Sequence, residues 1–226
     1  MRDRDLAILN FTWRYRLGLA EVFHRRFFEG LTPKAAERVI TRLMKEEVLQ
    51  SFALHGANRY YTLTPKGARV LGVSEKWLEK PMGPQALIQN VSILAACCLG
   101  PTARERMTAE EFTGRFPGLV VRGLGSSRYY LHREGPDRAV RLGLFLPDFQ
   151  SDARRIVRKV RREFDRRMKH PEWNRLIRGD LFVVTVLTAF PNKVDRLEQL
   201  LGRERWPYRI QAVPSITNLL VREDHL

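Results

Sequence analysis

The sequence predicts an α+β protein in two parts: a winged helix-turn-helix domain over residues 1–73 and a small α/β domain with a mixed central sheet over residues 85–226. Three observations predict this class. Residues 1–72 show three amphipathic helical patterns, then a β-hairpin pattern and a short returning helix. Strand and helix patterns alternate in the second half. Between the halves, Pro81-Met-Gly-Pro84 breaks regular structure, so residues 74–84 are expected to form a linker.

The third amphipathic helix is predicted to begin at Thr32-Pro33, because threonine can cap a helix and proline fits the first turn. Its apolar residues, which are expected to face a core, are Ala36, Val39, Ile40 and Leu43. The opposite face carries Lys34, Arg38, Thr41, Arg42 and Lys45. In a helix-turn-helix, the second helix of the pair enters the major groove, where arginine reads guanine and lysine reaches phosphate. Lys34, Arg38 and Arg42 are the expected base readers, and a solvated basic face is the alternative.

A hairpin pattern follows directly, with arms at residues 49–54 and 59–63 and a tip at residues 55–58. In this position a hairpin would form the wing that lies against the sugar–phosphate backbone, with Arg59 and His55 as its contacts. Thr64-Pro65 then starts a short helix, residues 66–71, which Gly72 closes. Lys45, Lys66 and Arg69 are expected to hold phosphates.

The composition predicts the same partner. The chain has 40 Lys and Arg against 25 Asp and Glu, and its net charge of +15 favours binding to polyanions through counterion release. Its 44% hydrophobic content is ample for packed cores. No signal peptide and no apolar run of membrane-spanning length is apparent, so a cytoplasmic protein is expected. The two adjacent cysteines and five scattered histidines match no metal-ligand spacing, so neither a metal nor a cofactor is expected.

The second domain is predicted from alternating elements. Residues 128–132 and 139–146 are expected to form a strand hairpin turning at residues 134–137. A long helix at 152–170, a strand at 181–189 buried on both faces, a helix at 192–201 and a last strand at 208–213 follow. Thr108-Ala-Glu-Glu111 predicts a capping box for a short helix. The nearly uncharged helix at residues 85–99 must be buried in the chain or in a dimer interface, and a homodimer is expected.

The helix at residues 152–170 carries the densest charge in the chain. Its predicted apolar stripe is Ala153, Ile156, Val157, Val160, Phe164 and Met168. The remaining positions hold nine cations: Arg154, Arg155, Arg158, Lys159, Arg161, Arg162, Arg166, Arg167 and Lys169. This excess favours a nucleic-acid-facing helix, with Arg154, Arg155, Arg158 and Arg162 as expected contacts, over a merely solvated face. A calmodulin-like protein or an anionic membrane could also accept such a helix.

Several phrases of residues 3–72 resemble the replication-relaxation family. They are Arg4-Asp-Leu-Ala-Ile-Leu9, Trp13-Arg-Tyr-Arg16, Thr32-Pro-Lys-Ala-Ala-Glu-Arg38 with Arg42-Leu43, and Tyr60-Tyr-Thr-Leu-Thr-Pro-Lys-Gly67. The resemblance implies a winged-helix protein of plasmids and integrated mobile elements. It also implies a second α/β domain similar to restriction-endonuclease-like nucleases.

The sequence lacks the catalytic motif of such nucleases. Such nucleases hold a metal with an acidic residue on one strand and an acidic-x-Lys triplet on the next, and no Asp-x-Lys or Glu-x-Lys triplet occurs in this sequence. Asp137 and Asp148 follow prolines that more readily mark a turn and a strand end. Phosphate-binding glycine loops and nucleophile elbows are also absent from the sequence. A degenerate, non-enzymatic domain is therefore expected.

Together these patterns predict a sequence-selective, double-stranded DNA-binding protein of a bacterial mobile element that regulates transcription or replication. Two alternatives remain open at this point. One is a metal-dependent nuclease or relaxosome component that uses Asp137, Asp148 and Glu163. The other is an adaptor whose basic surface binds an acidic protein partner.

Overall fold

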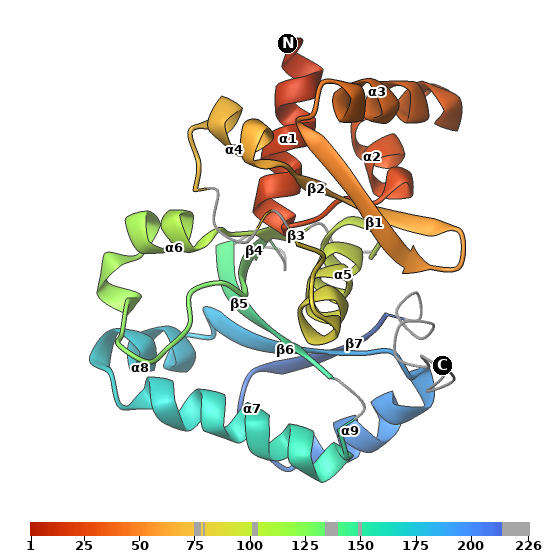
Figure 1. Cartoon of the computed structure of the whole chain (residues 1–226). Helices are drawn as coiled ribbons and strands as arrows, with labels where there is room; N and C mark the ends of the chain where they lie inside the picture. Colours follow the sequence, from red (N-terminus) through yellow and green to blue (C-terminus); the bar gives the residue numbers. More distant parts are fainter. Residues whose placement is uncertain (75–77, 79, 101–103, 134–139, 149–150, 214–226) are drawn as a thin grey trace. The chain divides into compact units, whose positions relative to one another are not determined.

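The computed structural model describes residues 1–74, 78, 80–100, 104–133, 140–148 and 151–213 (Figure 1). The chain divides into two compact units, Met1–Leu94 and Ala95–Leu226, called here the first and second units. The division falls inside helix α5 (Pro84–Cys98), whereas the sequence placed a linker at residues 74–84. The class is α+β: helices with a β-hairpin come first, and a mixed five-stranded sheet with helices follows.

The first unit contains α1 (Asp3–Tyr15), α2 (Ala20–Phe27), α3 (Pro33–Lys45), β1 (Leu49–His55), β2 (Asn58–Leu63) and α4 (Pro65–Leu71). This element order agrees with the sequence prediction. The first three helices, together with Phe28 directly after α2, contribute buried apolar side chains to one core: Ile8, Leu9, Phe23, Phe28, Ala36, Ile40 and Leu43. Gly18, between α1 and α2, bonds to Tyr61 of β2, and a Cβ there would lie 2.0 Å from the Phe23 ring. Only glycine fits such a close approach.

The two threonine–proline helix starts behave differently. Thr64 caps α4 as expected, because its Oγ1 accepts a hydrogen bond from the Gly67 backbone N–H at 3.0 Å. Thr32 occupies the N-cap position of α3 with extended backbone angles, but its side chain makes no capping bond. The α3 start therefore depends on Pro33, whose missing N–H needs no partner in the first turn.

The hairpin is antiparallel and pairs Leu49 with Leu63 and Phe52 with Tyr60. Its tip is shorter than predicted, since β1 extends to His55 and β2 begins at Asn58. Gly56 has a φ of +55°, in the left-handed region that a tight turn needs. The hairpin therefore has a fixed register up to its tip, with one irregularity between Ala53 and His55.

The second unit is built on a sheet of strand order β3-β4-β5-β6-β7. The strands are β3 (Arg104–Arg106), β4 (Tyr129–Arg133), β5 (Val140–Pro147), β6 (Phe182–Thr188) and β7 (Tyr208–Ala212). The first three are antiparallel, whereas β5, β6 and β7 are parallel, so the sheet is mixed as predicted. All of β6 and the following Ala189 are buried, which confirms the expectation for residues 182–189, whereas Leu181 is exposed and lies outside the strand. The sequence missed β3, and the predicted turn at residues 134–137 lies outside the described residues.

Helices α7 (Ala153–Met168), α8 (Pro171–Arg178) and α9 (Val194–Leu201) lie on one face of this sheet (Figure 1). The buried side chains of α7 pack with Leu142, Leu144, Phe182 and Val184 of the strands. The predicted helix at 152–170 ends earlier, because Pro171 lacks an N–H and starts α8 instead. The capping box of α6 (Ala109–Arg115) is present as predicted, with Thr108 and Glu111 each accepting from the other's backbone N–H.

Helix α5 follows the prediction for residues 85–99 closely. Its side chains are buried within the chain at Leu87 and from Asn90 to Cys97, so the buried face is wider than the predicted stripe. Ala86, which was expected on that stripe, is exposed. Among the described residues no helix is long and apolar enough to cross a membrane.

Candidate nucleic-acid interface

The exposed face of α3 is the first part of the interface. Ala36, Ile40 and Leu43 point into the core of the first unit, as their 3.6-residue spacing predicts. The other face is exposed and carries Lys34, Arg38, Thr41 and Lys45. Among the described residues, no acid lies within ion-pair distance of Lys34, Arg38 or Lys45. These three cations are therefore available to a ligand, and each additional ion pair with phosphate would release a counterion.

Arg42 lies differently from the other predicted contacts. Its guanidinium binds both carboxylate oxygens of Asp5 on α1, at 2.6 and 3.1 Å, and also reaches Glu46 at 3.2 Å. The Asp5 side chain is only 1% exposed, while that of Arg42 is 36% exposed. Arg42 is thus held by an internal acid, which differs from the free base-reading side chain expected from sequence. We assign it as a positioning residue that fixes α3 against α1.

The electrostatics of Asp5 support this assignment. Burial by itself would raise the pKa of the Asp5 carboxyl, but the hydrogen bonds and charge of Arg42 and the backbone N–H of Arg2 outweigh burial and lower it. The same contact raises the pKa of Arg42. The pair is therefore ionised at neutral pH, and the paired arginine stabilises a buried carboxylate that would otherwise be costly.

The hairpin presents its predicted contacts at and beside the tip. His55 and Arg59 are both exposed. The Arg59 guanidinium donates to Ser51 Oγ at 2.9 Å and to the Ser51 carbonyl at 3.1 Å, across the hairpin. Neither of these acceptors carries a net charge, so Arg59 keeps its positive charge uncompensated there. The contact restricts its side chain before any ligand binds, which reduces the entropy lost on binding.

Helix α4 supplies the two remaining predicted contacts of the first unit, and both are exposed. Lys66 lies 3.4 Å from Glu47, a contact between two exposed side chains that contributes little stability. Arg69 lies in the last turn of the same helix.

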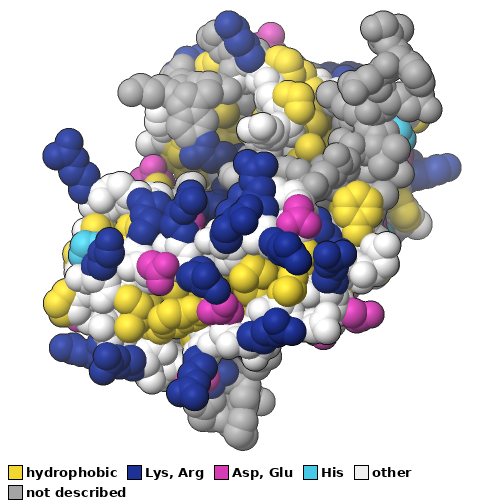
Figure 2. Space-filling view, turned by 90° about the horizontal axis from the view of Figure 1, so that it is seen from below, with side chains coloured by type: hydrophobic (Ala, Val, Ile, Leu, Met, Phe, Trp, Pro, Cys, Tyr) yellow, Lys and Arg dark blue, Asp and Glu magenta, His cyan; other side chains and the backbone are white. Residues whose placement is uncertain are grey.

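The outer face of α7 is the basic surface of the second unit. Four arginines that the sequence predicted as contacts are exposed, and no described residue forms an ion pair with them: Arg154, Arg155, Arg158 and Arg162. Figure 2 views the molecule from the side on which α7 and α9 lie in Figure 1, and shows Lys and Arg side chains over much of this face with some Asp and Glu between them.

Other cations of α7 are already engaged. Arg161 pairs with Glu204 at 2.5 Å, Arg166 donates to the Gly123 carbonyl, and Lys159 donates to Ser151 Oγ at 3.2 Å. These contacts hold α7 to the segments around it. The charge density that the sequence shows is therefore divided between structural cations and available ones.

Arg167 corrects the sequence prediction for α7, which placed it on the solvated face. Its side chain is 1% exposed and donates to Glu163 Oε2 at 2.5 Å and to the Tyr129 hydroxyl at 2.8 Å. Its guanidinium carbon also lies 5.1 Å from the ring centre of Trp173 and 5.4 Å from that of Phe182. Aromatic faces and one carboxylate thus replace water around a buried cation. Arg167 belongs to the core.

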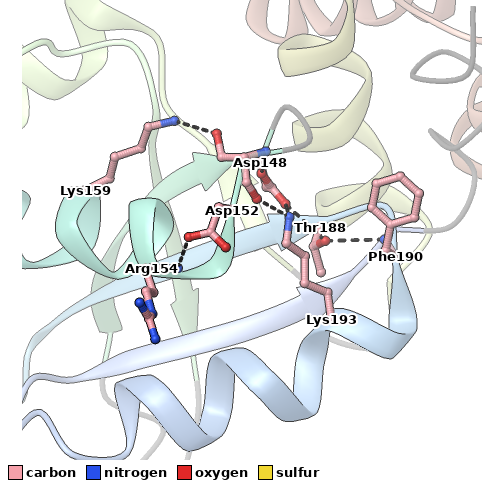
Figure 3. A network of polar contacts seen from close by, with 8 residues as sticks. Asp148, Asp152, Arg154, Lys159, Thr188, Phe190 and Lys193 are labelled. Atoms are coloured by element: carbon pink, nitrogen blue, oxygen red, sulfur yellow. Dashed lines mark hydrogen bonds and ion pairs between the residues drawn. The ribbon is translucent and has the colours of Figure 1, made fainter.

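A buried ion pair lies where the parallel strands β5 and β6 end (Figure 3). Lys193 donates to Asp148 Oδ2 at 2.5 Å, and the other carboxylate oxygen accepts from the Ser151 backbone N–H at 2.8 Å. Thr188 Oγ1 lies 3.4 Å from the same carboxylate. The sequence analysis considered Asp148 as a candidate acid of a nuclease site but did not identify Lys193 as its partner, because 45 residues separate the two. This network links the end of β5 to the segment that leads into α9.

The carboxylates of the nuclease alternative do not gather at one place. Asp148 precedes α7, whereas Glu163 lies far along it, about 15 Å from the helix start at 1.5 Å per residue. Each is paired with a cation of the chain, Lys193 and Arg167 respectively. Asp137 lies outside the described residues. Across those residues, no cluster of three or more His, Cys, Asp or Glu is placed to hold a metal ion.

The sequence did not predict a buried histidine surrounded by three arginines on the sheet face away from α7. His132 of β4 lies near Arg104 of β3, Arg141 of β5 and Arg209 of β7, and it is 2% exposed. Burial, and then the charges of these arginines, lower its pKa to about 4. His132 is therefore neutral at physiological pH. Only the strand pairing brings these four residues together.

Comparison with known proteins adds no identification: no protein-family model matches the chain, and no match to a curated protein is found.

Proposed function

We propose that residues 1–73 form a winged helix-turn-helix domain that binds double-stranded DNA selectively, and that the protein regulates transcription or replication of a bacterial mobile element. The observation that carries the proposal is the exposed face of α3, with Lys34, Arg38, Thr41 and Lys45 in one row and without internal acids paired to its cations. The mobile-element setting rests on the resemblance of residues 3–72 to the replication-relaxation family.

In this proposal α3 enters the major groove as the second helix of the α2–α3 pair. Arg38 lies near the middle of the exposed face and reads base edges, where a bidentate arginine–guanine contact discriminates by about 1–3 kcal/mol. Lys34 and Lys45 lie near the two ends of α3 and hold phosphates. Arg42 stays on Asp5 and sets the orientation of the helix.

The hairpin acts as the wing in the same proposal. Arg59 and His55 contact the sugar–phosphate backbone beside the groove that α3 occupies, and the cross-strand bonds of Arg59 to Ser51 favour this use by ordering the side chain. Lys66 and Arg69 add phosphate contacts. These contacts position the protein and carry no sequence information.

The test begins with enrichment of random duplexes on the purified full chain, followed by affinity measurements on the enriched sequence. Arg38→Ala is expected to weaken binding to that sequence by roughly tenfold or more and to reduce the preference over an unrelated duplex. Arg25→Ala is the matched control, since it removes one exposed arginine that pairs with Glu21 on α2. No enriched motif, or equal effects of the two substitutions, would overturn the proposal.

The same enrichment tests the homodimer that the sequence predicts. Helix-turn-helix dimers bind half-sites about one helical turn apart, so a dimer selects a motif with twofold symmetry. A single unpaired half-site, together with monomeric sedimentation on DNA, would contradict the dimer without affecting the α3 proposal.

A further inference from the structure

The available arginines of α7 form a regular row. Arg154, Arg158 and Arg162 are spaced by four residues, so they follow one side of the helix with a rise of about 6 Å at each step. Arg155 is exposed beside this row in the first turn. No described residue pairs with these four guanidinium groups, in contrast to Arg161, Arg166 and Arg167 on the same helix.

This row works against the stability of the helix that carries it. Like charges at i and i+4 destabilise a helix by roughly 0.2–0.5 kcal/mol for each pair. Arg154 and Arg155 also lie in the first turn, where the helix dipole disfavours cations and where the only acid is the N-cap residue Asp152, whose carboxylate accepts from the Arg154 backbone N–H at 2.9 Å. A helix selected only for folding would place acids at these positions, so the row indicates a polyanionic ligand.

The burial of the apolar face of α7 indicates which kind of polyanionic partner the helix can bind. A membrane or a calmodulin-like protein would need the apolar stripe of the helix, because both bind the apolar face of amphipathic helices. Here Ile156, Val160 and Phe164 are at most 1% exposed and belong to the core of the second unit. Val157 and Met168, at the edges of the stripe, are half-buried, so the accessible surface of α7 is mainly its charged face. The phosphodiester backbone of a nucleic acid presents a charge every 3.4 Å along each strand, and it fits a row that is about 12 Å long.

A depression beside the row extends this surface toward α9. It has a volume of about 610 Å³ and is lined by Arg154 of α7 and by Asn192, Asp195, Arg196, Gln199 and Leu200. Arg196 is exposed and adds a fifth arginine, while the amides of Asn192 and Gln199 can donate to phosphate oxygens. Asp195 is the one acid of the lining, so the depression is less positive than the outer face of α7.

We propose that the outer face of α7, together with this depression, is a separate nucleic-acid surface that binds the phosphodiester backbone without reading sequence. The inference goes beyond the proposed function, because it assigns a binding activity to the second unit that does not depend on α3. It predicts that the affinity for any duplex depends on the row, whereas sequence preference depends on Arg38.

The experiment compares two charge-matched variants of the full chain. The row variant carries Arg154→Gln, Arg158→Gln and Arg162→Gln. The control variant carries Arg115→Gln, Arg175→Gln and Arg178→Gln, which removes the same charge from exposed positions of α6 and α8. Thermal unfolding of both variants establishes that they are folded.

Binding is measured for an enriched duplex, an unrelated duplex of equal length and an unrelated single strand, over a range of salt concentrations. The row variant is expected to lose on the order of tenfold in affinity for both duplexes alike, and the slope of log affinity against log salt should be shallower by about 3 units. The single strand shows whether the surface prefers duplex or single-stranded backbone. The control variant should change affinity much less than the row variant does.

Three outcomes would overturn the inference. Equal losses in the row and control variants would show that only net charge matters. A loss confined to the enriched duplex would make the row a sequence reader. A loss of binding to phosphatidylserine vesicles or to polyglutamate, without a loss for nucleic acid, would assign the face to another partner. If no enriched duplex is found, a row-specific loss on the unrelated duplex still supports the inference while the α3 proposal fails.

Discussion

Helices α3 and α7 are two basic amphipathic helices in different units, and they divide their cations in the same way. Each holds one arginine against a buried or nearly buried acid, Arg42 on Asp5 and Arg167 on Glu163. Each also leaves several cations exposed. They differ in setting: α3 follows a short helix and precedes a hairpin, whereas α7 covers a sheet. A basic face alone therefore does not define a mode of binding, because the surrounding elements decide what can approach it.

The largest expected effect tests the internal arginine of α7. Arg167→Met keeps the apolar contacts with the aromatic rings but leaves Glu163, which is 14% exposed, without its closest cation. Breaking a buried pair from one side costs about 3–5 kcal/mol, so the free energy of unfolding should fall by that order. Urea denaturation measures it. Arg166→Met, the adjacent exposed arginine, is the control, and similar losses in both variants would contradict the core role of Arg167.

The second unit is expected to lose stability in mild acid because of His132. The pKa of His132 in the folded second unit is lowered to about 4, below its ordinary value of 6.5. Between these values the unfolded chain binds a proton that the folded chain does not, so stability is complete above pH 6.5 and falls as the pH drops toward 4. The expected loss is about 3 kcal/mol, because each unit of difference in pKa corresponds to about 1.4 kcal/mol.

Urea denaturation at several pH values, followed in parallel with the His132→Gln variant, measures this loss. The substitution should flatten the dependence of stability on pH between 6.5 and 4. An unchanged slope in the variant would show that other groups cause the loss.

The Arg42–Asp5 pair of the first unit is the counterpart of the Arg167–Glu163 pair, and breaking it is expected to lower the free energy of unfolding by less. Asp5→Asn removes the charge that holds Arg42, whose side chain remains 36% exposed and can be solvated, so a loss of about 2 kcal/mol is expected. Because the pKa of Asp5 is lowered, its contribution is present above the unfolded pKa near 3.8 and is lost as the pH falls below it. In the Asn variant this acid dependence should weaken. A loss as large as that of Arg167→Met would remove the distinction between the two pairs.

The smallest expected effect is a gain in stability instead of a loss. Arg154→Glu replaces a cation by an acid in the first turn of α7, which suits the helix dipole and relieves repulsion along the row, so stability should rise by about 0.5–1 kcal/mol. Affinity for an unrelated duplex should fall in the same variant. Thermal unfolding and a binding titration on one preparation test both expectations. A less stable variant would show that the row is not in conflict with folding.

Short-range patterns in the sequence predicted most elements correctly. The Thr64-Pro65 start and the Thr108–Glu111 capping box depend on contacts within three residues, and both are present as predicted. The buried strand β6 and the core stripe of α3 followed from periodicity alone. The short strand β3 was missed because three residues carry no usable periodicity, and its neighbours in the sheet come from far along the chain.

By itself, the sequence determined the order of the elements, the apolar faces that form the cores and the excess of positive charge, because each depends on composition or on spacing along the chain. The tertiary structure alone decided which cations are free. Asp5 lies 37 residues from Arg42, and Lys193 lies 45 residues from Asp148, so no local pattern could join them. An arginine looks the same in a sequence whether it faces solvent or a buried carboxylate, and only folding brings the acid to it.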